Sequence, residues 1–402
     1  MVEQHGKTLV PQIRFAGFTD PWEQRKLGEL TESYSGGTPA AGESEFYGGS
    51  IPFIRSAEIA AESTELFLTE KGYESSSARM VKPGDVLYAL YGATSGEVAV
   101  SRQKGAINQA ILAILPRDDC DARYITAWLR KQKGYIVTTY LQGGQGNLSG
   151  VIVKNLEVSI PSLPEQQKIG FMLSHLDSLI TLHQRKYDKL CVLKKSMLDK
   201  MFPKGGSLYP EIRFAGFTDP WEQRKLGELY QKNDERNTDG LGSERTLSVA
   251  SMTFNSAGNG ADDSSLPNYK RLRLGDIAFE GHTNKEFAYG RFVLNDAGNG
   301  IMSPRFTCLR PIVEQEYSFW KYFIHSEKVM RPILVNSTKS GTMMNELVVE
   351  DFLKQEILVP SLPEQRRIGA FFDRLDSLIT LHQRKLELLR NIKKSMLDKM
   401  FV

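Results

Sequence analysis

Residues 161–202 read PSLPEQQKIGFMLSHLDSLITLHQRKYDKLCVLKKSMLDKMF, and residues 360–401 read PSLPEQRRIGAFFDRLDSLITLHQRKLELLRNIKKSMLDKMF. Both stretches carry apolar residues at alternating intervals of four and three, which is the pattern of a helix that buries one continuous seam. Each stretch opens with Ser-Leu-Pro-Glu, where the serine can cap a helix and the glutamate can complete a capping box. The sequence therefore predicts two long, nearly identical helices.

The two predicted helices have apolar seams of equal length and similar residue types. Since neither helix can cover its own seam, the simplest arrangement packs one helix against the other. The alternative is that each helix belongs to the core of a separate domain. The positions predicted at the helix-pair interface are Ile169, Leu173, Leu176, Ile180 and Leu190 in the first helix, and Ile368, Phe372, Leu375, Ile379 and Leu389 in the second.

A second repeat lies ahead of each helix. Residues 11–30, PQIRFAGFTDPWEQRKLGEL, recur as residues 210–229 with the single change of Gln12 to Glu211, and both repeats are offset by 199 residues. The chain is therefore a tandem duplication of a leader, a variable segment and a long helix. We expect antiparallel helices, with the two leaders in equivalent places and the two variable segments related by an approximate twofold axis.

The variable segments differ in sequence but keep their landmarks in the same order. Each has a Gly-Asp pair before an apolar run, a Trp-centred amphipathic stretch, and a loop rich in Gly, Ser or Thr. Apolar runs at 107–115 and 151–160 predict strands. We therefore expect an α+β protein with two globular domains joined by two long helices. The predicted divisions are a leader 1–30, a first globule 31–158, a first helix 159–202, a linker and second leader 203–229, a second globule 230–358 and a second helix 359–402.

Composition places the chain among ordinary soluble proteins. It has 402 residues, 41% of them apolar, and a formal net charge of +3, so composition alone does not indicate a nucleic-acid partner. Its three cysteines are far apart in the sequence, which argues against a disulfide framework and fits a reducing compartment. The sequence shows neither a secretory signal nor an apolar run long enough to span a membrane, so we expect a cytoplasmic protein with no membrane partner.

Motifs of catalysis are missing from the sequence. No phosphate-binding loop of the G-x-x-x-x-G-K-[ST] type is present, and the dispersed histidines predict no metal site. The pieces Phe15-Ala-Gly-Phe18 and Asp20-Pro-Trp22 superficially resemble motifs of adenine methyltransferases, but the glycine pattern is incomplete and the two pieces lie too close together. We therefore predict no catalytic residue, no metal and no cofactor in this chain.

The repeats resemble those of one known family. The doubled P-x-I-R-F-x-G-F…W-E-x-x-K-L-G-E-L and the doubled P-S-L-x-E-Q-x-x-I are similar to motifs of the specificity subunit of type I restriction-modification enzymes. The first globule also resembles the family at 51–55, 84–85, 91–94 and 107–110, whereas the second departs from that version at most of these places. The resemblance covers the chain from about residue 11 to its end.

The resemblance implies a non-catalytic subunit that recognises DNA within a larger enzyme. Each globule would be a target recognition domain that reads its own half of a split, asymmetric site in double-stranded DNA. The helices would set the gap between the half-sites and dock two methyltransferase subunits, with motor-nuclease subunits completing the enzyme. S-adenosylmethionine, ATP and Mg would then belong to those partner subunits.

Candidate DNA contacts are polar residues in predicted loops. Arginine and lysine suit guanine, asparagine and glutamine suit adenine, and other polar groups contact the backbone. Residues 31–158 hold 12 basic and 14 acidic side chains, and residues 230–357 hold 15 and 17, so binding would need local clustering of the basic groups. The candidates are Arg55, Ser56, Tyr91, Thr94, Gln145 and Asn147 in the first globule, and His282, Thr283, Asn284, Lys285, Lys339, Ser340 and Thr342 in the second.

Two other functions compete with DNA recognition. A scaffold that presents two globules to protein partners would use the same long helices without binding DNA. A stand-alone methyltransferase or nuclease is disfavoured because its motifs are missing. Methylation of random-sequence DNA in the presence of a methyltransferase subunit tests the first alternative, and incubation of the chain alone with S-adenosylmethionine and DNA tests the second.

Overall fold

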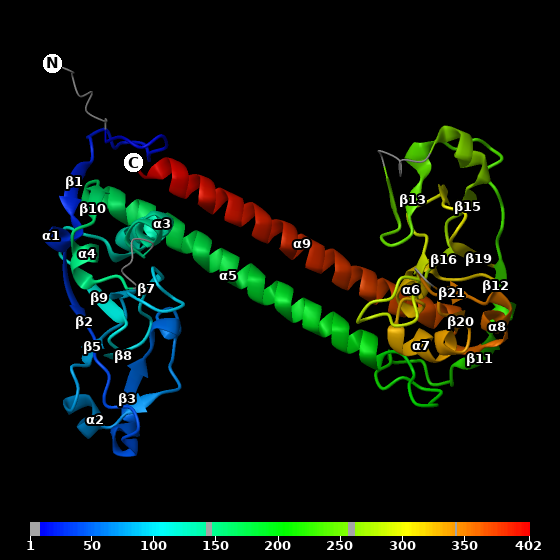
Figure 1. Ribbon diagram of the computed structural model, residues 1–402, viewed down its shortest axis with the longest axis horizontal. Coiled ribbons are helices and arrows are strands. Elements are labelled where there is room, and N and C mark those ends of the chain that lie inside the picture. The colour runs from blue at the N-terminus through cyan, green and yellow to red at the C-terminus, as the bar shows by residue number, and fades with distance from the viewer. Residues whose placement is uncertain (1–8, 142–146, 256–261, 342–343) are drawn as a thin grey trace. The chain divides into compact units, whose positions relative to one another are not determined.

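The computed structural model describes residues 9–141, 147–255, 262–341 and 344–402. The chain forms two compact units, one of Met1–Gln184 with Arg384–Val402 (unit 1) and one of Arg185–Gln383 (unit 2). The two predicted long helices are present as α5 (Leu163–Lys200) and α9 (Leu362–Met400), green and red in Figure 1. Each helix gives one half to each unit.

Within each unit the two helix halves run in opposite directions, which confirms the prediction of antiparallel packing. In unit 1, Lys393 pairs with Asp177, and Arg390 Nη2 donates to Gln184 Oε1 at 2.9 Å, so positions ascend along α5 as they descend along α9. In unit 2, Phe202, just past the end of α5, packs against Phe372 near the start of α9, with ring centroids 6.1 Å apart.

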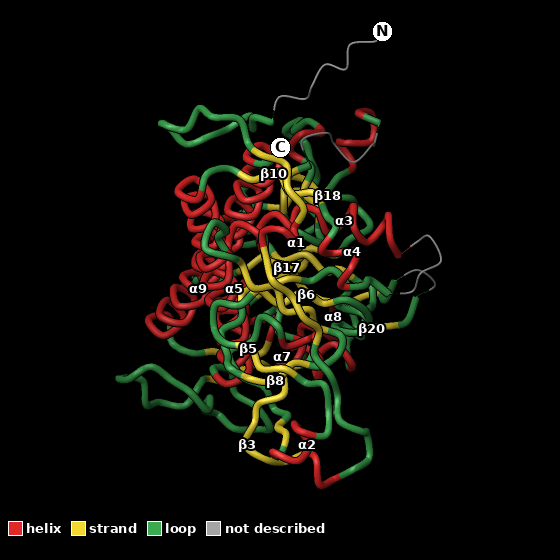
Figure 2. Tube along the Cα trace, turned by 90° about the vertical axis from the view of Figure 1, so that its left-hand side faces the viewer, coloured by secondary structure: helices red, strands yellow, loops and turns green. Residues whose placement is uncertain are grey.

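Unit 1 holds two four-stranded sheets and a two-stranded ribbon. The first sheet has the order β2-β9-β6-β7, and the second the order β4-β3-β8-β5. Strands are yellow in Figure 2, where α2 lies beside β3. The strands are β1 (Glu23–Lys26), β2 (Thr31–Ser35), β3 (Tyr47–Ile54), β4 (Phe67–Leu68), β5 (Arg79–Val81), β6 (Val86–Ala89), β7 (Val98–Val100), β8 (Gly105–Ile107), β9 (Ile111–Pro116) and β10 (Glu157–Ile160). The helices are α1 (Leu27–Leu30), α2 (Glu70–Glu74), α3 (Ala122–Leu141) and α4 (Gly150–Lys154), with 3₁₀ turns η1 (Ser44–Phe46) and η2 (Ser56–Glu58).

Unit 2 repeats the first sheet and the ribbon but builds the rest differently. Its four-stranded sheet has the order β12-β19-β16-β17, and β11 pairs with β22 as β1 pairs with β10 in unit 1. The strands are β11 (Glu222–Lys225), β12 (Tyr230–Lys232), β13 (Leu247–Ser248), β14 (Thr253–Phe254), β15 (Lys270–Leu272), β16 (Ile277–Glu280), β17 (Arg291–Leu294), β18 (Gly300–Met302), β19 (Thr307–Pro311), β20 (Thr338–Lys339), β21 (Glu346–Leu347) and β22 (Glu356–Val359). The helices are α6 (Tyr317–Phe323), α7 (Glu327–Val335) and α8 (Val349–Lys354), with 3₁₀ turns η3 (Leu226–Glu228), η4 (Ser243–Arg245) and η5 (Asp263–Asn268).

The leader of unit 1 joins the start of one long helix to the end of the other. Arg14 donates through Nε and Nη2 to both carboxylate oxygens of Glu165 in α5, at 2.7 and 2.8 Å, while Ile13 N donates to Lys399 O in α9 at 3.0 Å. The Glu165 side chain is fully buried. The carboxylate that the sequence predicts in a capping box is thus bonded by the leader.

Unit 2 makes the same connection with the helices exchanged. Arg213 forms a two-pronged ion pair with Glu364 of α9, at 2.7 Å for both bonds, and Ile212 N donates to Lys200 O of α5 at 3.0 Å. The hydrogen bond to the carboxylate raises the pKa of the Arg213 guanidinium above its ordinary value. The two leaders therefore occupy equivalent places, as the repeat predicts.

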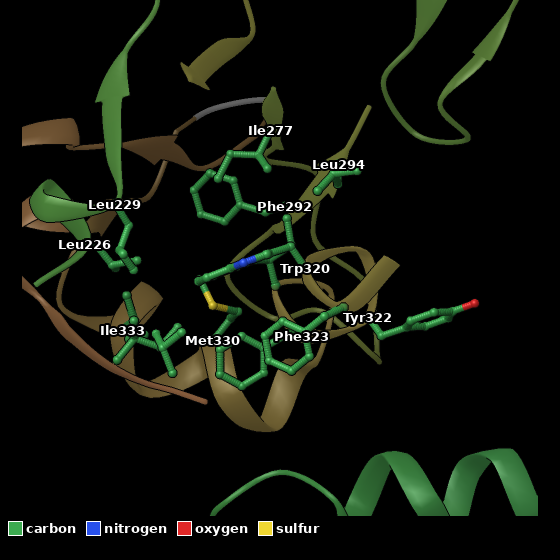
Figure 3. Packing of buried hydrophobic residues seen from close by; sticks show 14 of the residues in the cluster. Leu226, Leu229, Ile277, Phe292, Leu294, Trp320, Tyr322, Phe323, Met330 and Ile333 are labelled. Atoms are coloured by element: carbon green, nitrogen blue, oxygen red, sulfur yellow. The ribbon is translucent and has the colours of Figure 1, made fainter. Parts of the chain in front are cut away.

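Aromatic packing closes each core around the tryptophan of its leader. Trp22 meets Tyr124 of α3 and Phe401 edge to face, with ring centroids 6.0 and 6.4 Å apart. In unit 2, Trp221 meets Phe319 at 6.0 Å. Figure 3 shows further members of that cluster, including side chains from β16, β17, α6 and α7. Such edge-to-face pairs add to the stabilisation that burial alone provides.

Most of the predicted seam residues belong to one of these two core clusters, but Ile180, Ile379 and Leu389 belong to neither. Those at the starts of the helices lie in the cores, where they also contact the globules, and those nearer the middle are partly buried. The assignment of single positions to a helix-pair interface stays a prediction. The fully buried members are Ile169, Leu173, Ile368, Phe372 and Leu375, and the partly buried members are Leu176, Ile180, Leu190, Ile379 and Leu389.

Two of the predicted strands differ from the structure. Residues 151–160 divide into helix α4 and strand β10, because the Ser149 hydroxyl accepts from Ile152 N at 3.3 Å and starts a helical turn. Residues 107–115 are divided between β8 and β9 by a turn at Asn108 to Ala110. The rest of the architecture confirms the α+β prediction, and among the described residues no helix is long and apolar enough to cross a membrane.

Candidate nucleic-acid interface

In unit 1 the loop after the inner strand β6 meets the loop before α4. Leu148 N donates to Leu90 O at 3.0 Å, so Tyr91 and Asn147 lie in neighbouring loops although they are distant in the sequence. Asn147 is exposed and Tyr91 is half-buried. Gln145, predicted in the same loop, lies outside the described residues.

Unit 2 joins the corresponding loops in the same way. Asn345 N donates to Gly281 O at 2.9 Å, which holds the loop after β16 against the loop between β20 and β21. A Cβ atom at Gly281 would collide with Asn345 O, so glycine allows this close approach. Two unlike sequences thus build the same pair of loops at the end of the same sheet strand.

The remaining candidates of unit 1 flank a segment that sequence reasoning did not include among the DNA contacts. Asn108 N donates to Ile54 O next to Arg55, and Leu90 N donates to Ala110 O next to Tyr91. Residues 108–110 therefore connect the loop at 55–56 with the loop at 91–94. The motif at 107–110 was visible in the sequence, but only the fold places it between two candidate loops.

Two side chains of unit 1 are restrained by their neighbours. Arg55 donates to both carboxylate oxygens of Glu58, at 3.1 and 2.7 Å, and this bond raises the pKa of the guanidinium. Burial raises the pKa of the Tyr91 hydroxyl, while a hydrogen bond with Gln109 acts in the opposite direction. Both residues are therefore held in place before any ligand binds. Thr94 lies in a tight turn, where its carbonyl accepts from Glu97 N at 2.9 Å.

The loop after β16 in unit 2 carries four neighbouring candidates. His282 Nδ1 lies 2.6 Å from Glu280 Oε1, and Arg291 Nε donates to the other carboxylate oxygen of Glu280 at 3.2 Å. Asn284 Oδ1 accepts from the backbone at Glu286 and Phe287, both at 2.8 Å, so this side chain shapes the loop. The four exposed candidates of this loop are His282, Thr283, Asn284 and Lys285.

The β20-β21 hairpin supplies the second loop of unit 2. Lys339 lies in β20 opposite Glu346, and Ser340 follows it, both of them exposed. Ser56 of unit 1 is partly buried in the turn η2. Thr342 lies outside the described residues. The structure thus brings the candidates at 282–285 and 339–340 together, which the sequence did not predict.

A cleft of about 520 Å³, lined by both polar and apolar side chains, adjoins the loop at 282–285. Its lining includes His282 and Glu280, together with Arg305 and Phe306 from the turn between β18 and β19. The Arg305 guanidinium lies 4.8 Å from the centre of the Phe306 ring. Sequence reasoning missed Arg305, because nothing in the chain predicts that the turn at 303–306 lies beside the loop at 282–285.

Within the described residues no group of three or more His, Cys, Asp or Glu side chains is arranged to hold a metal ion. The two deeply buried thiols, Cys120 and Cys308, have pKa values of about 12 because burial disfavours their charged forms. Neither thiol is therefore available as a nucleophile near neutral pH. What the loops offer is hydrogen bonding and positive charge.

Comparison with known families identifies the repeated architecture. The family model described as "Type I restriction modification DNA specificity domain" matches twice, at residues 19–191 and 218–391. The chain belongs to this family. Each match includes the second part of a leader, a whole globule and most of a long helix, so the duplication seen in the sequence is a duplication of the family domain.

Relatives across most of the chain carry the same description. The "Type I restriction enzyme MjaIX specificity subunit" of Methanocaldococcus jannaschii is 24% identical and aligns over 100% of this chain and 97% of its own length. The MjaVIII specificity subunit of the same organism is 22% identical, with 94% and 92% covered. Among solved structures, the S subunit of a type I system from M. genitalium shares the fold with a TM-score of 0.54 and 14% identity, over 98% of this chain and 99% of that one.

As a type I specificity subunit, the chain is the non-catalytic component of a larger restriction-modification enzyme. Its two globules are the target recognition domains of the family. The family assignment agrees with the resemblance seen in the sequence, and it favours DNA recognition over a scaffold that does not bind DNA.

Proposed function

We propose that this specificity subunit reads a bipartite, asymmetric site in double-stranded DNA, with one half-site for each target recognition domain. The observation that carries the proposal is the pair of loops joined by one backbone bond, Leu148 to Leu90 in unit 1 and Asn345 to Gly281 in unit 2. The scaffold is repeated, but the side chains on the loops are not. Equivalent loops with different side chains are expected to read different bases.

The proposed recognition domains are residues 31–158 and 230–358. In the first, Asn147 offers both a donor and an acceptor to an adenine edge, and Arg55 is suited to guanine or phosphate. In the second, Lys285 and Lys339 supply positive charge from the two adjoining loops, which favours the phosphate backbone or guanine. Since neither domain is basic overall, we expect the isolated chain to bind DNA weakly and with strong dependence on salt.

The long helices are the proposed docking surface for two methyltransferase subunits. Large apolar side chains remain exposed along them, which is unusual for a helix with no further partner. They are Phe171, Leu182, Val192, Leu381 and Leu388, exposed by 60, 46, 69, 45 and 60%. Motor-nuclease subunits would complete the enzyme in the cytoplasm, where the partners would bind S-adenosylmethionine, ATP and Mg.

The test is methylation of a random-sequence DNA library by the chain together with a cognate methyltransferase subunit. Wild-type complex should give one split motif, and the chain alone with labelled S-adenosylmethionine should transfer no methyl group. Lys285→Ala and Lys339→Ala should weaken or relax only the half-site read by unit 2. Lys354→Ala serves as the control, because Lys354 is also an exposed lysine of unit 2 but lies outside both loops, in α8.

Two outcomes would contradict the proposal. Relaxation of both half-sites by a change in unit 2 would mean that the domains do not read independently. Methylation without any sequence preference, from a soluble complex, would favour a scaffold whose globules bind protein partners.

A further inference from the structure

The long helices carry an aspartate at equivalent positions, Asp177 and Asp376, in the repeated LDSLITL motif. In unit 1, Asp177 Oδ2 accepts from Arg130 Nη1 of α3 at 2.5 Å, and its other oxygen is paired with Lys393 of α9. Arg130 Nε also donates to Val98 O in β7 at 3.2 Å. One carboxylate therefore joins the recognition domain to both long helices.

Unit 2 makes the same junction with a different group from its recognition domain. Asp376 Oδ2 accepts from the Tyr322 hydroxyl of α6 at 2.7 Å, and Asp376 Oδ1 lies 2.6 Å from Lys194 Nζ of α5. The Tyr322 hydroxyl also lies 2.9 Å from Asp373 Oδ1. Figure 3 shows this hydroxyl pointing away from the other labelled side chains of the cluster.

A second contact holds each recognition domain to the helix, seven residues earlier. A Cβ atom at Gly170 would lie 2.6 Å from Asp121 Oδ1 and 2.8 Å from Tyr124 N, so the start of α3 presses directly on α5. Gly369 makes the equivalent approach to Phe319 of α6. Seven residues of helix span about 10 Å. Two contacts separated by this distance fix the direction of α3 or α6 across the long helix.

The packing beside the junction differs between the units. In unit 1 the cleft lined by Arg130, Asp177 and Lys393 has a volume of about 170 Å³. In unit 2 the cleft lined by Tyr322 and Asp376 has a volume of about 810 Å³. The recognition domain of unit 2 thus has open space beside its junction. If the hydrogen bonds of the Tyr322 hydroxyl are lost, this open space allows the domain to rotate about the contact at Gly369.

We propose that Asp177 and Asp376 are positioning residues that fix the angle of each recognition domain on the helices and thereby restrict the subunit to one spacing between its half-sites. The inference rests on the proposed function. One base pair advances along DNA by about 3.4 Å. If a half-site is displaced by one base pair, the recognition domain that reads it must move by about 3.4 Å. The contacts at Asp177 and Asp376 oppose this movement.

The experiment measures spacing on DNA with both cognate half-sites and a gap of the natural length or one base pair longer or shorter. Wild-type chain, Asp177→Ala, Tyr322→Phe and the control Glu387→Ala are each assayed with the methyltransferase subunit. Glu387→Ala also removes one carboxylate from the long helices, at an exposed position. We expect Asp177→Ala and Tyr322→Phe to raise methylation at altered gaps, relative to the natural gap, at least tenfold. The half-site sequences that the two variants recognise should be those of wild type. The control Glu387→Ala should show the same preference for the natural gap as wild type.

Spacing as strict as in wild type for both Asp177→Ala and Tyr322→Phe would overturn the inference. Tyr322→Phe decides the matter if Asp177→Ala does not fold, because this variant loses a single oxygen atom and keeps the ring in its cluster. A wild-type complex with no split motif would overturn the proposed function as well. A split motif with unchanged spacing in the variants would overturn the positioning role alone.

Discussion

The ion pair between Arg14 and Glu165 gives the sharpest prediction of stability. The Glu165 side chain has no exposed surface and that of Arg14 is 12% exposed, and two hydrogen bonds join them. Arg14→Met leaves a buried carboxylate without its partner. Breaking a buried pair in this way costs about 3–5 kcal/mol. Since Arg14 retains some contact with water, we expect the lower end, about 3 kcal/mol.

The assay is urea unfolding followed by a probe in unit 1. With an m-value of about 3 kcal/mol per molar urea, a loss of about 3 kcal/mol lowers the midpoint by about 1 M. Arg25→Ala is the matched control in the same leader. Arg25 pairs with Asp119 at 2.9 Å, but the two side chains are 33 and 56% exposed, so this change should cost about 1 kcal/mol or less.

A double variant separates loss of the pair from loss of packing. Replacing both partners, as in Arg14→Met with Glu165→Leu, removes the buried charge together with its counter-ion. Stability should therefore recover by most of the loss seen in Arg14→Met. The account is refuted if Arg14→Met costs no more than Arg25→Ala, or if the double variant is less stable than the single one.

Three further outcomes follow from the structure. Gly170→Ala should destabilise unit 1 in thermal unfolding, because the added Cβ would lie 2.8 Å from Tyr124 N. Gly134→Ala is the control: no atom lies within 4 Å of its added Cβ, so the change should be neutral or stabilise the protein by up to about 1 kcal/mol. A disulfide reagent at pH 8 should leave Cys120 and Cys308 unmodified until the protein unfolds, since both thiols have a pKa of about 12. An unfolded thiol ionises near pH 8.5, so the unfolded state loses these protons first and the free energy of unfolding should fall as pH rises from about 8.5 toward 12.

The repeated parts of the fold were the most predictable from sequence. A seam of period 3.5 and the Ser-Leu-Pro-Glu start define α5 and α9 locally, and the offset of 199 residues indicates that each part occurs twice. The helix at Gly150–Lys154 was missed because an apolar run predicts strand and short helix equally well. The Ser149 cap makes these residues a helix, and capping depends on backbone geometry as well as on residue type.

The candidate interface could be predicted only as a set of separate loops. Their pairing depends on single backbone bonds, such as Asn345 to Gly281, between groups that carry no sequence signal. The contacts that Asp177 and Asp376 make with the recognition domains could not be predicted from the sequence for a related reason. Asp177 and Asp376 repeat in the sequence, but their partners are an arginine in one unit and a tyrosine in the other, so no repeat points to them.

Exchange of one recognition domain tests the central claim most directly. Residues 31–158 are replaced by the corresponding domain of another family member, and the chimera and the wild-type chain are each expressed with the methyltransferase subunit in a host free of DNA methylation. Long-read sequencing then maps every methylated adenine. We predict a split, asymmetric motif for both chains, with one half-site changed and the other half-site kept. Two changed half-sites, or no motif from a soluble wild-type complex, would contradict the account.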